Sequence, residues 1–77
     1  MNWIESPKTR DCYWNLKDES GKFTIIQLPN SFELSYDFRV EDVIVRTTHL
    51  SWSLSALKSL AEILSTDAIV IHHNSIC

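Results

Sequence analysis

The amino-acid sequence predicts a small α+β domain: a four- to five-stranded mixed sheet, mainly antiparallel, with one amphipathic helix packed on one of its faces. Two patterns support this fold class, an unbroken alternation of apolar and polar residues from 32 to 41 and a helical repeat of leucines from 54 to 64. A chain of 77 residues has room for only one hydrophobic core. We therefore expect residues 1–77 to form a single domain with the element order β-β-β-β-α-β.

The alternating segment is the most specific structural signal in the chain. Its apolar positions are Phe32, Leu34, Tyr36, Phe38 and Val40, and its polar positions are Glu33, Ser35, Asp37, Arg39 and Glu41. Successive side chains of a strand point to opposite faces, so the apolar set is expected to face the core and the polar set to face solvent. The alternation changes phase at residues 41–42, which favours two strands, 31–38 and 42–48, over one bent strand.

Two earlier strands are predicted from local composition. Segments 10–17 and 22–28 are rich in aromatic and aliphatic residues, which favour extended structure. The polar loop between them, residues 18–21, ends in the only glycine of the chain, and a glycine with a positive φ suits a hairpin loop. In the first of these strands, parity places Trp14 and Leu16 against the core.

The helix is predicted to begin after Ser51 or Ser53, because either side chain can accept a hydrogen bond from a free backbone N–H group. Its leucines recur at spacings of three and four, so one side of the helix is apolar and faces the sheet. Residues 68–72 are apolar on both sides and predict a last, central strand. Because a helix separates the strands 42–48 and 68–72, we expect these two strands to be parallel and their crossover to be right-handed.

The composition argues against several classes of protein. Apolar residues make up 44% and charged residues 22% of the chain, as in an ordinary soluble domain. The longest aliphatic run, residues 68–71, is far too short for a membrane helix, and the charged residues among the first ten argue against a signal peptide. A cytoplasmic location is therefore expected. The net charge of −3, without a cluster of Lys and Arg, disfavours nucleic acid as a direct ligand.

No catalytic or metal-binding motif occurs in the sequence. A single glycine rules out the nucleophile elbow and the glycine-rich phosphate loops. The residues that could bind a metal do not follow the spacing of a zinc motif; they are Cys12, His49, His72, His73 and Cys77. Without a secretion signal, Cys12 and Cys77 are expected to be free thiols. We therefore expect no enzyme activity, no cofactor and no metal site.

The face of the sheet that the helix leaves uncovered is the predicted binding surface. Strand parity gives it both charge signs around aromatic and aliphatic side chains, and its candidate anchors are Tyr13, Lys17, Asp37, Arg39, Ile44 and Arg46. Trp3 and Trp52 have no obvious place in the core and join this set, because Trp, Tyr and Arg dominate interface hot spots. The free edge of an outer strand offers a second mode of docking.

These features favour a small non-catalytic protein-binding module that acts stoichiometrically as an inhibitor or adaptor of a larger partner complex, as phage-type anti-defence inhibitors do. The expected partner is another protein, and neither a membrane nor nucleic acid is expected to bind. Two alternatives stay open. One is a structural subunit of a homo-oligomer, with a homodimer as the simplest form. The other is a small enzyme or metal-binding protein that uses the histidines and cysteines.

Overall fold

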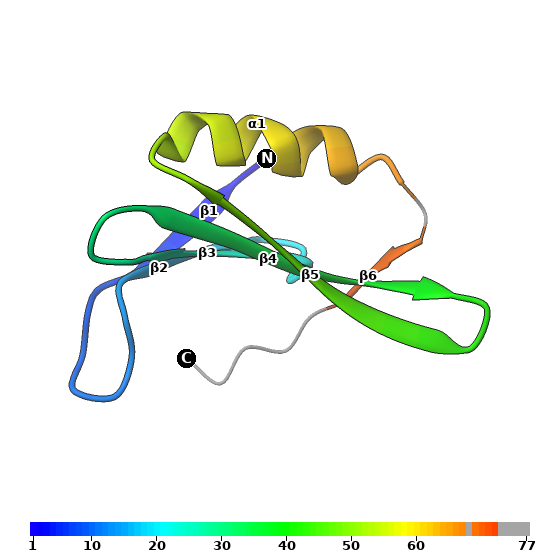
Figure 1. The fold of residues 1–77 in the computed structure, drawn as a ribbon, viewed down its shortest axis with the longest axis horizontal. Helices are drawn as coiled ribbons and strands as arrows, with labels where there is room; N and C mark the ends of the chain where they lie inside the picture. Colours follow the sequence, from blue (N-terminus) through cyan, green and yellow to red (C-terminus); the bar gives the residue numbers. More distant parts are fainter. Residues whose placement is uncertain (68, 73–77) are drawn as a thin grey trace.

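The computed structural model describes residues 1–67 and 69–72. Its strands are β1 (Trp3–Ser6), β2 (Asn15–Asp18), β3 (Phe23–Gln27), β4 (Phe32–Val40), β5 (Val43–Ser51) and β6 (Val70–Ile71), and its helix is α1 (Leu54–Leu64). The strands form one sheet with the order β1-β2-β3-β4-β5, and β6 also pairs with β4. In Figure 1, α1 lies across one face of this twisted sheet. The predicted α+β class, with one helix on one face of a sheet, is confirmed.

Every strand pair among the described residues is antiparallel. β3 pairs with residues 32–36 of β4, and β6 continues along the same side of β4 at Asp37 and Phe38. Because β5 and β6 are both antiparallel to β4, they run in the same direction, as expected for the two strands on either side of the helix. They do not pair with each other, since β4 lies between them. Of the predicted strand 68–72, Ala68 lies outside the described residues.

The N-terminal region differs from the prediction. β1 was not expected, because a strand of four residues is too short to show a pattern; it pairs with the whole of β2. β2 begins at Asn15 rather than at residue 10. The segment before it is a loop, in which the backbone N–H of Thr9 donates a hydrogen bond to the carbonyl of Cys12 at 2.9 Å.

Cys12 lies in this loop and is disulfide-bonded. The expectation of a free thiol is therefore wrong for Cys12. The second cysteine of that expectation, Cys77, lies outside the described residues.

The loop between β2 and β3 has the predicted conformation. Gly21 has a φ of 76°, and its backbone N–H donates to the carbonyl of Asp18 at 3.0 Å. The Asp18 carboxylate is buried and accepts hydrogen bonds from the backbone N–H groups of Ser20 and Phe23. A side chain that satisfies these backbone donors fixes the turn, which aligns β2 with β3.

Residues 32–51 form a hairpin of two nine-residue strands, so the interpretation as two strands is confirmed. Its turn consists of Glu41 and Asp42, and Glu41 has a φ of 56°. Because β3 pairs only with the first half of β4, the tip of the hairpin extends beyond the rest of the sheet, as Figure 1 shows. Val40, which the alternation places against the core, is consequently 49% exposed.

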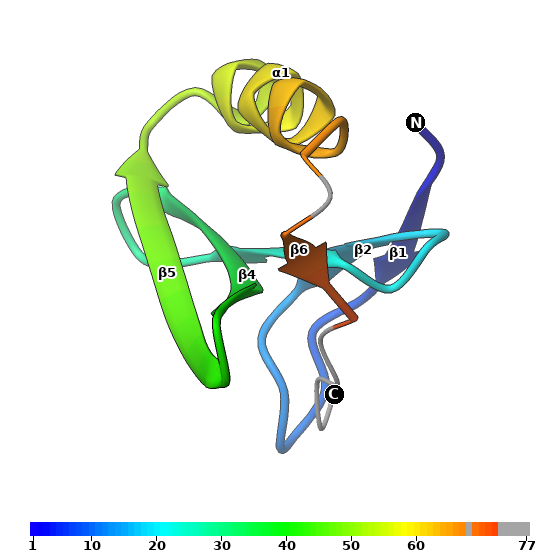
Figure 2. The same ribbon diagram turned by 90° about the vertical axis from the view of Figure 1, so that its right-hand side faces the viewer.

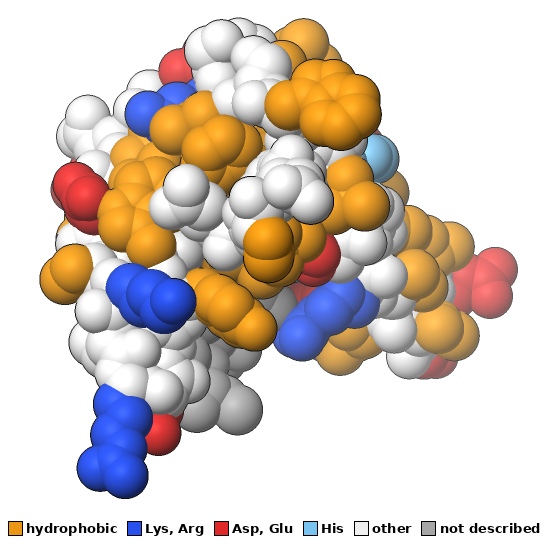
Figure 3. Space-filling view, turned by 60° about the vertical axis from the view of Figure 1, so that its left-hand side comes forward, with side chains coloured by type: hydrophobic (Ala, Val, Ile, Leu, Met, Phe, Trp, Pro, Cys, Tyr) orange, Lys and Arg blue, Asp and Glu red, His pale blue; other side chains and the backbone are white. Residues whose placement is uncertain are grey.

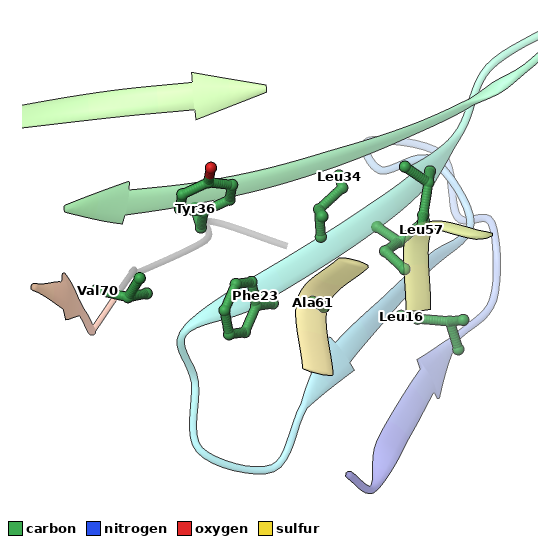
Figure 4. Packing of buried hydrophobic residues seen from close by; sticks show 8 residues of the cluster. Leu16, Phe23, Leu34, Tyr36, Leu57, Ala61 and Val70 are labelled. Atoms are coloured by element: carbon green, nitrogen blue, oxygen red, sulfur yellow. The ribbon is translucent and has the colours of Figure 1, made fainter. Parts of the chain in front are cut away.

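The hydrophobic core lies between α1 and the sheet (Figure 4). It consists of Leu16, Phe23, Ile25, Leu34, Tyr36, Leu57, Ala61 and Val70. The helix contributes Leu57 and Ala61, which are one turn apart and so share the face toward the sheet. The N-cap is Ser53, which is one of the two serines predicted for this position. Its hydroxyl accepts a hydrogen bond from the backbone N–H of Ala56.

The opposite side of the sheet is less open than the alternation predicts. Asp37, expected to face solvent, is only 9% exposed. It lies between two neighbours in the sheet, Arg46 of β5 and Ile71 of β6. The predicted solvent exposure is therefore wrong for Asp37, because β6 covers one flank of this residue and a long arginine side chain covers the other.

Candidate protein interface

The candidate site lies on the side of the sheet turned away from α1, which we call the open face. The strand register arranges its side chains in rows across the sheet. Lys17, Thr24, Ser35 and Thr48 form one row from β2 to β5. Asp37 and Arg46 form the next row, and Arg39 and Ile44 form a third row near the tip of the hairpin.

Five of the predicted site residues belong to the open face; they are Lys17, Asp37, Arg39, Ile44 and Arg46. Only part of this set is brought together and exposed. Arg39, Ile44 and Arg46 are neighbours on β4 and β5, and all three are exposed. Lys17 is half-buried on β2, and both β3 and β4 separate it from β5. Asp37 is too deeply buried to reach a partner directly.

The remaining three predicted residues lie elsewhere. Trp3 pairs with Asp18 and packs against the core, so it belongs to the side that carries α1. Tyr13 is exposed in the loop before β2, next to an open hollow that Trp14 and Gln27 help to line. Trp52 follows β5 directly and is 85% exposed, more than any other large apolar side chain among the described residues.

Leu50 belongs to the candidate interface and was missed by the sequence analysis. It is 67% exposed, and it lines an open hollow of about 350 Å³ together with Ser31, Ser51 and Trp52. The signal was present, because Leu50 shares strand parity with Ile44 and therefore points to the same face. It was overlooked because the predicted strand ended at residue 48, whereas β5 continues to Ser51.

An ion pair fixes the centre of the open face. Arg46 Nε donates to Asp37 Oδ1 at 3.0 Å, and a terminal guanidinium nitrogen lies 3.4 Å from Asp37 Oδ2. The hydrogen bond to Asp37 raises the pKa of Arg46 above its ordinary value. Burial opposes this shift, and the charge of Asp37 adds to it. The carboxylate thus holds the guanidinium group on the open face, where the Arg46 side chain is 59% exposed.

Figure 3 shows the molecule from the side of the hairpin base, where apolar side chains lie among Lys and Arg side chains. The exposed apolar residues of β5 and its C-terminal neighbour are Val43, Ile44, Val45, Leu50 and Trp52. Apolar patches that are interspersed with arginines are typical of surfaces that bind other proteins.

The outer edge of β5 is a second feature of this region. β5 lies at one end of the sheet and β1 at the other (Figure 2), and no strand in the described part of the chain pairs with the outer side of β5. The backbone N–H of Arg39 donates to the carbonyl of Ile69 at 2.9 Å, so the backbone of Arg39 turns away from β5. Hydrogen-bonding residues alternate along an antiparallel strand. The register then assigns the outward-pointing backbone groups to Ile44, Arg46, Thr48 and Leu50.

The two histidines in the described part of the chain, His49 and His72, lie against a core side chain and a turn. His49 stacks on Tyr36 of the core, with 3.1 Å between His49 Nε2 and Tyr36 Oη. His72 lies beside the Gly21 turn. No group of three or more His, Cys, Asp or Glu among residues 1–67 and 69–72 is arranged to hold a metal ion. His73 and Cys77, which the metal-binding alternative also used, lie outside these residues.

Comparison with protein families, with curated proteins and with solved structures finds no match to this chain. In the residues that the structure describes, no helix has the length and apolar character needed to cross a lipid bilayer. The candidate site therefore has to be interpreted from its own chemistry.

Proposed function

We propose that this chain is a non-catalytic protein-binding module that acts stoichiometrically, as an inhibitor or adaptor of a larger protein. The observation that supports this proposal is the joint exposure of Arg39, Ile44, Leu50 and Trp52 over β4 and β5. Ile44 is 56% exposed, and Leu50 and Trp52 are more exposed still. Burying an apolar side chain of this size in a protein interface is favourable by about 1.5–3 kcal/mol. Because these side chains are exposed in the single chain, a binding partner would have to provide the surface that buries them.

The chemistry of the open face specifies the kind of partner. Trp52 and Leu50 offer an apolar anchor at one end of β5, and Arg39 and Arg46 offer two cations toward the other end. A complementary surface would carry an apolar pocket with acidic groups about four to six residues along an extended strand from it, which is roughly 13–20 Å. We therefore propose a protein surface with an acidic rim as the partner, although the net charge of the chain is negative.

The experiment uses the tagged chain as bait in its native host and compares two matched double variants. One variant, Arg39→Glu with Trp52→Ala, removes a cation and an apolar anchor from the open face. The control, Lys58→Glu with Ile63→Ala, makes the same kinds of change on α1, where Ile63 is 69% exposed. We expect one protein to co-purify with the wild-type bait in comparable molar amount, and its apparent affinity to fall at least about tenfold with the open-face variant alone. Equal recovery with both variants would refute the proposed interface.

A further inference from the structure

The two edges of the sheet are protected very differently. β1 has four residues, carries Glu5 and is followed at once by Pro7. β5 has nine residues and contains no proline, lysine, aspartate or glutamate, and Arg46 is its only arginine. Natural proteins usually shorten, charge or cover an edge strand to prevent another strand from pairing with it. Within residues 1–67 and 69–72, the edge of β5 has none of these protections over most of its length.

We propose that β5 pairs in antiparallel orientation with β5 of a second copy of the chain, so that the sheet continues through a two-fold symmetric dimer. This proposal goes beyond the protein-binding function and does not depend on it. Its first support is the set of outward-pointing backbone groups of Ile44, Arg46, Thr48 and Leu50, which would form roughly eight hydrogen bonds across the symmetry axis. Burying a β-strand edge without such bonds would be unfavourable.

The sequence of β5 is complementary to itself in one register. When the two-fold axis passes through Thr47, the middle residue of the strand, all nine residues find a partner. Ile44 then lies opposite Leu50 of the second copy, and Arg46 lies opposite Thr48 of the second copy. Thr47 faces itself, and threonine pairs are favourable across strands.

The neighbouring register centred on Arg46 is less favourable. Moving the axis to Arg46 would place two arginines directly opposite each other, and like charges in this position are destabilising. It would also leave Leu50 without an apolar neighbour. The register through Thr47 avoids the charge repulsion and twice brings Ile44 against Leu50, which are 56% and 67% exposed in the single chain. Charge and apolar matching thus select a second copy as the occupant of this edge.

Dimerisation through β5 would join the open faces of the two copies into one larger surface. The open faces of both copies would lie on the same side of the joined sheet, because side-chain parity is conserved across an antiparallel pair. Ile44 and Leu50 would be partly covered at the seam, whereas Arg39 belongs to β4 and Trp52 follows the end of β5, so neither residue is part of the paired strands. The variant proposed above for the partner interface therefore leaves the residues of the paired strands unchanged, so co-purification and the measured mass test the two proposals separately.

The first test measures the mass of the purified chain by light scattering and sedimentation from low micromolar to sub-millimolar concentration. We expect twice the chain mass of 8.9 kDa at the higher concentrations. Thr48→Pro removes an outward N–H group without touching the bonds to β4, and proline is tolerated at edge positions of this kind. This variant should have the mass of a single chain, whereas Thr48→Val should still dimerise. A wild-type chain that remains monomeric throughout this range overturns the proposal.

A cross-linking pair tests the register and covers the case in which Thr48→Pro does not fold. Thr47→Cys would place two thiols opposite each other in a non-hydrogen-bonded pair, where the Cα atoms are about 4.5 Å apart and a disulfide can form. In Thr48→Cys the two thiols would be diagonal and about 7–8 Å apart, too far for efficient bonding. We expect a covalent dimer, on non-reducing gels under mild oxidation, several-fold more abundant for Thr47→Cys. Equal cross-linking of both variants, or none beyond that of the wild type, rejects the β5 pairing.

Discussion

Asp37 and Arg46 lie directly opposite each other on β4 and β5, and their side chains form an ion pair with 3.0 Å between Arg46 Nε and Asp37 Oδ1. The two partners are unequally exposed: the side chain of Asp37 is 13% exposed and that of Arg46 is 59% exposed. A largely buried carboxylate is stable only with hydrogen-bond donors. Arg46 therefore supports the fold of the hairpin as well as the chemistry of the open face.

Because only Arg46 pairs with this buried carboxylate, removing Arg46 and removing Arg39 should affect stability differently. Arg46→Ala should lower the free energy of unfolding by about 1 kcal/mol, because a hydrogen-bonded charge is removed from a buried carboxylate. Arg39→Ala should change it by less than about 0.5 kcal/mol, since Arg39 is exposed and forms no ion pair with any described residue. Urea unfolding of both variants measures the difference, and equal stabilities would contradict it.

The pH dependence of this contribution follows from the direction of the pKa shift. The hydrogen bond with Asp37 raises the pKa of Arg46, so the stabilisation is complete below the unfolded-state value and is lost only as the pH rises through the folded-state value. Both values lie far above neutral pH. The difference in stability between wild type and Arg46→Ala should therefore be the same at neutral and mildly alkaline pH, as urea titrations at both can show.

The tip of the hairpin offers a stabilising substitution. Glu41 is the first residue of a two-residue turn and has a φ of 56°, a conformation in which glycine is favoured. Glu41→Gly should raise the stability by about 0.5–1 kcal/mol, seen as a higher melting temperature. Asp42→Gly is the matched control, since Asp42 does not have a positive φ, and it should not stabilise. An unchanged or lower melting temperature for Glu41→Gly would show that the turn is not strained.

The turn between β2 and β3 should not tolerate a side chain at Gly21. A Cβ atom there would lie 3.0 Å from His72 Nε2, and the φ of 76° disfavours any L-residue. Gly21→Ala should therefore destabilise the protein by at least about 1 kcal/mol. Adding His72→Ala removes the close contact but not the backbone term, so the double variant should recover only part of the loss. Complete recovery would mean that the contact alone is responsible.

The N-cap of α1 is a separate point of stability. Ser53→Ala removes the hydrogen bond from the backbone N–H of Ala56, which is 3.2 Å from the Ser53 hydroxyl oxygen. This change should cost about 1 kcal/mol, and Ser53→Asp should retain most of the stability because a carboxylate can accept the same bond. Ser59→Ala, at an exposed position inside the helix, is the control and should be neutral or slightly stabilising. Thermal unfolding followed by circular dichroism compares the three variants.

The elements that the sequence determined are those with a long local pattern. The alternation placed Leu34 and Tyr36 in the core, and the leucine spacing with Ser53 defined α1, because side-chain period is a property of the strand or helix itself. Gly21 marked its turn for the same local reason. Strand parity also predicted correctly that Arg39, Ile44 and Arg46 lie on the open face.

The tertiary structure decided how these elements meet. The burial of Asp37 depends on β6 and Arg46 arriving on its two sides, and the exposure of Val40 depends on β3 ending before the hairpin does. Trp3 turned toward the core because β1, too short to predict, pairs with β2. The free edge of β5 likewise follows from the strand order. All of these features depend on pairing between segments that are distant in the sequence. A local pattern of apolar and polar residues shows that a segment is a strand, but it does not specify which strand pairs with it.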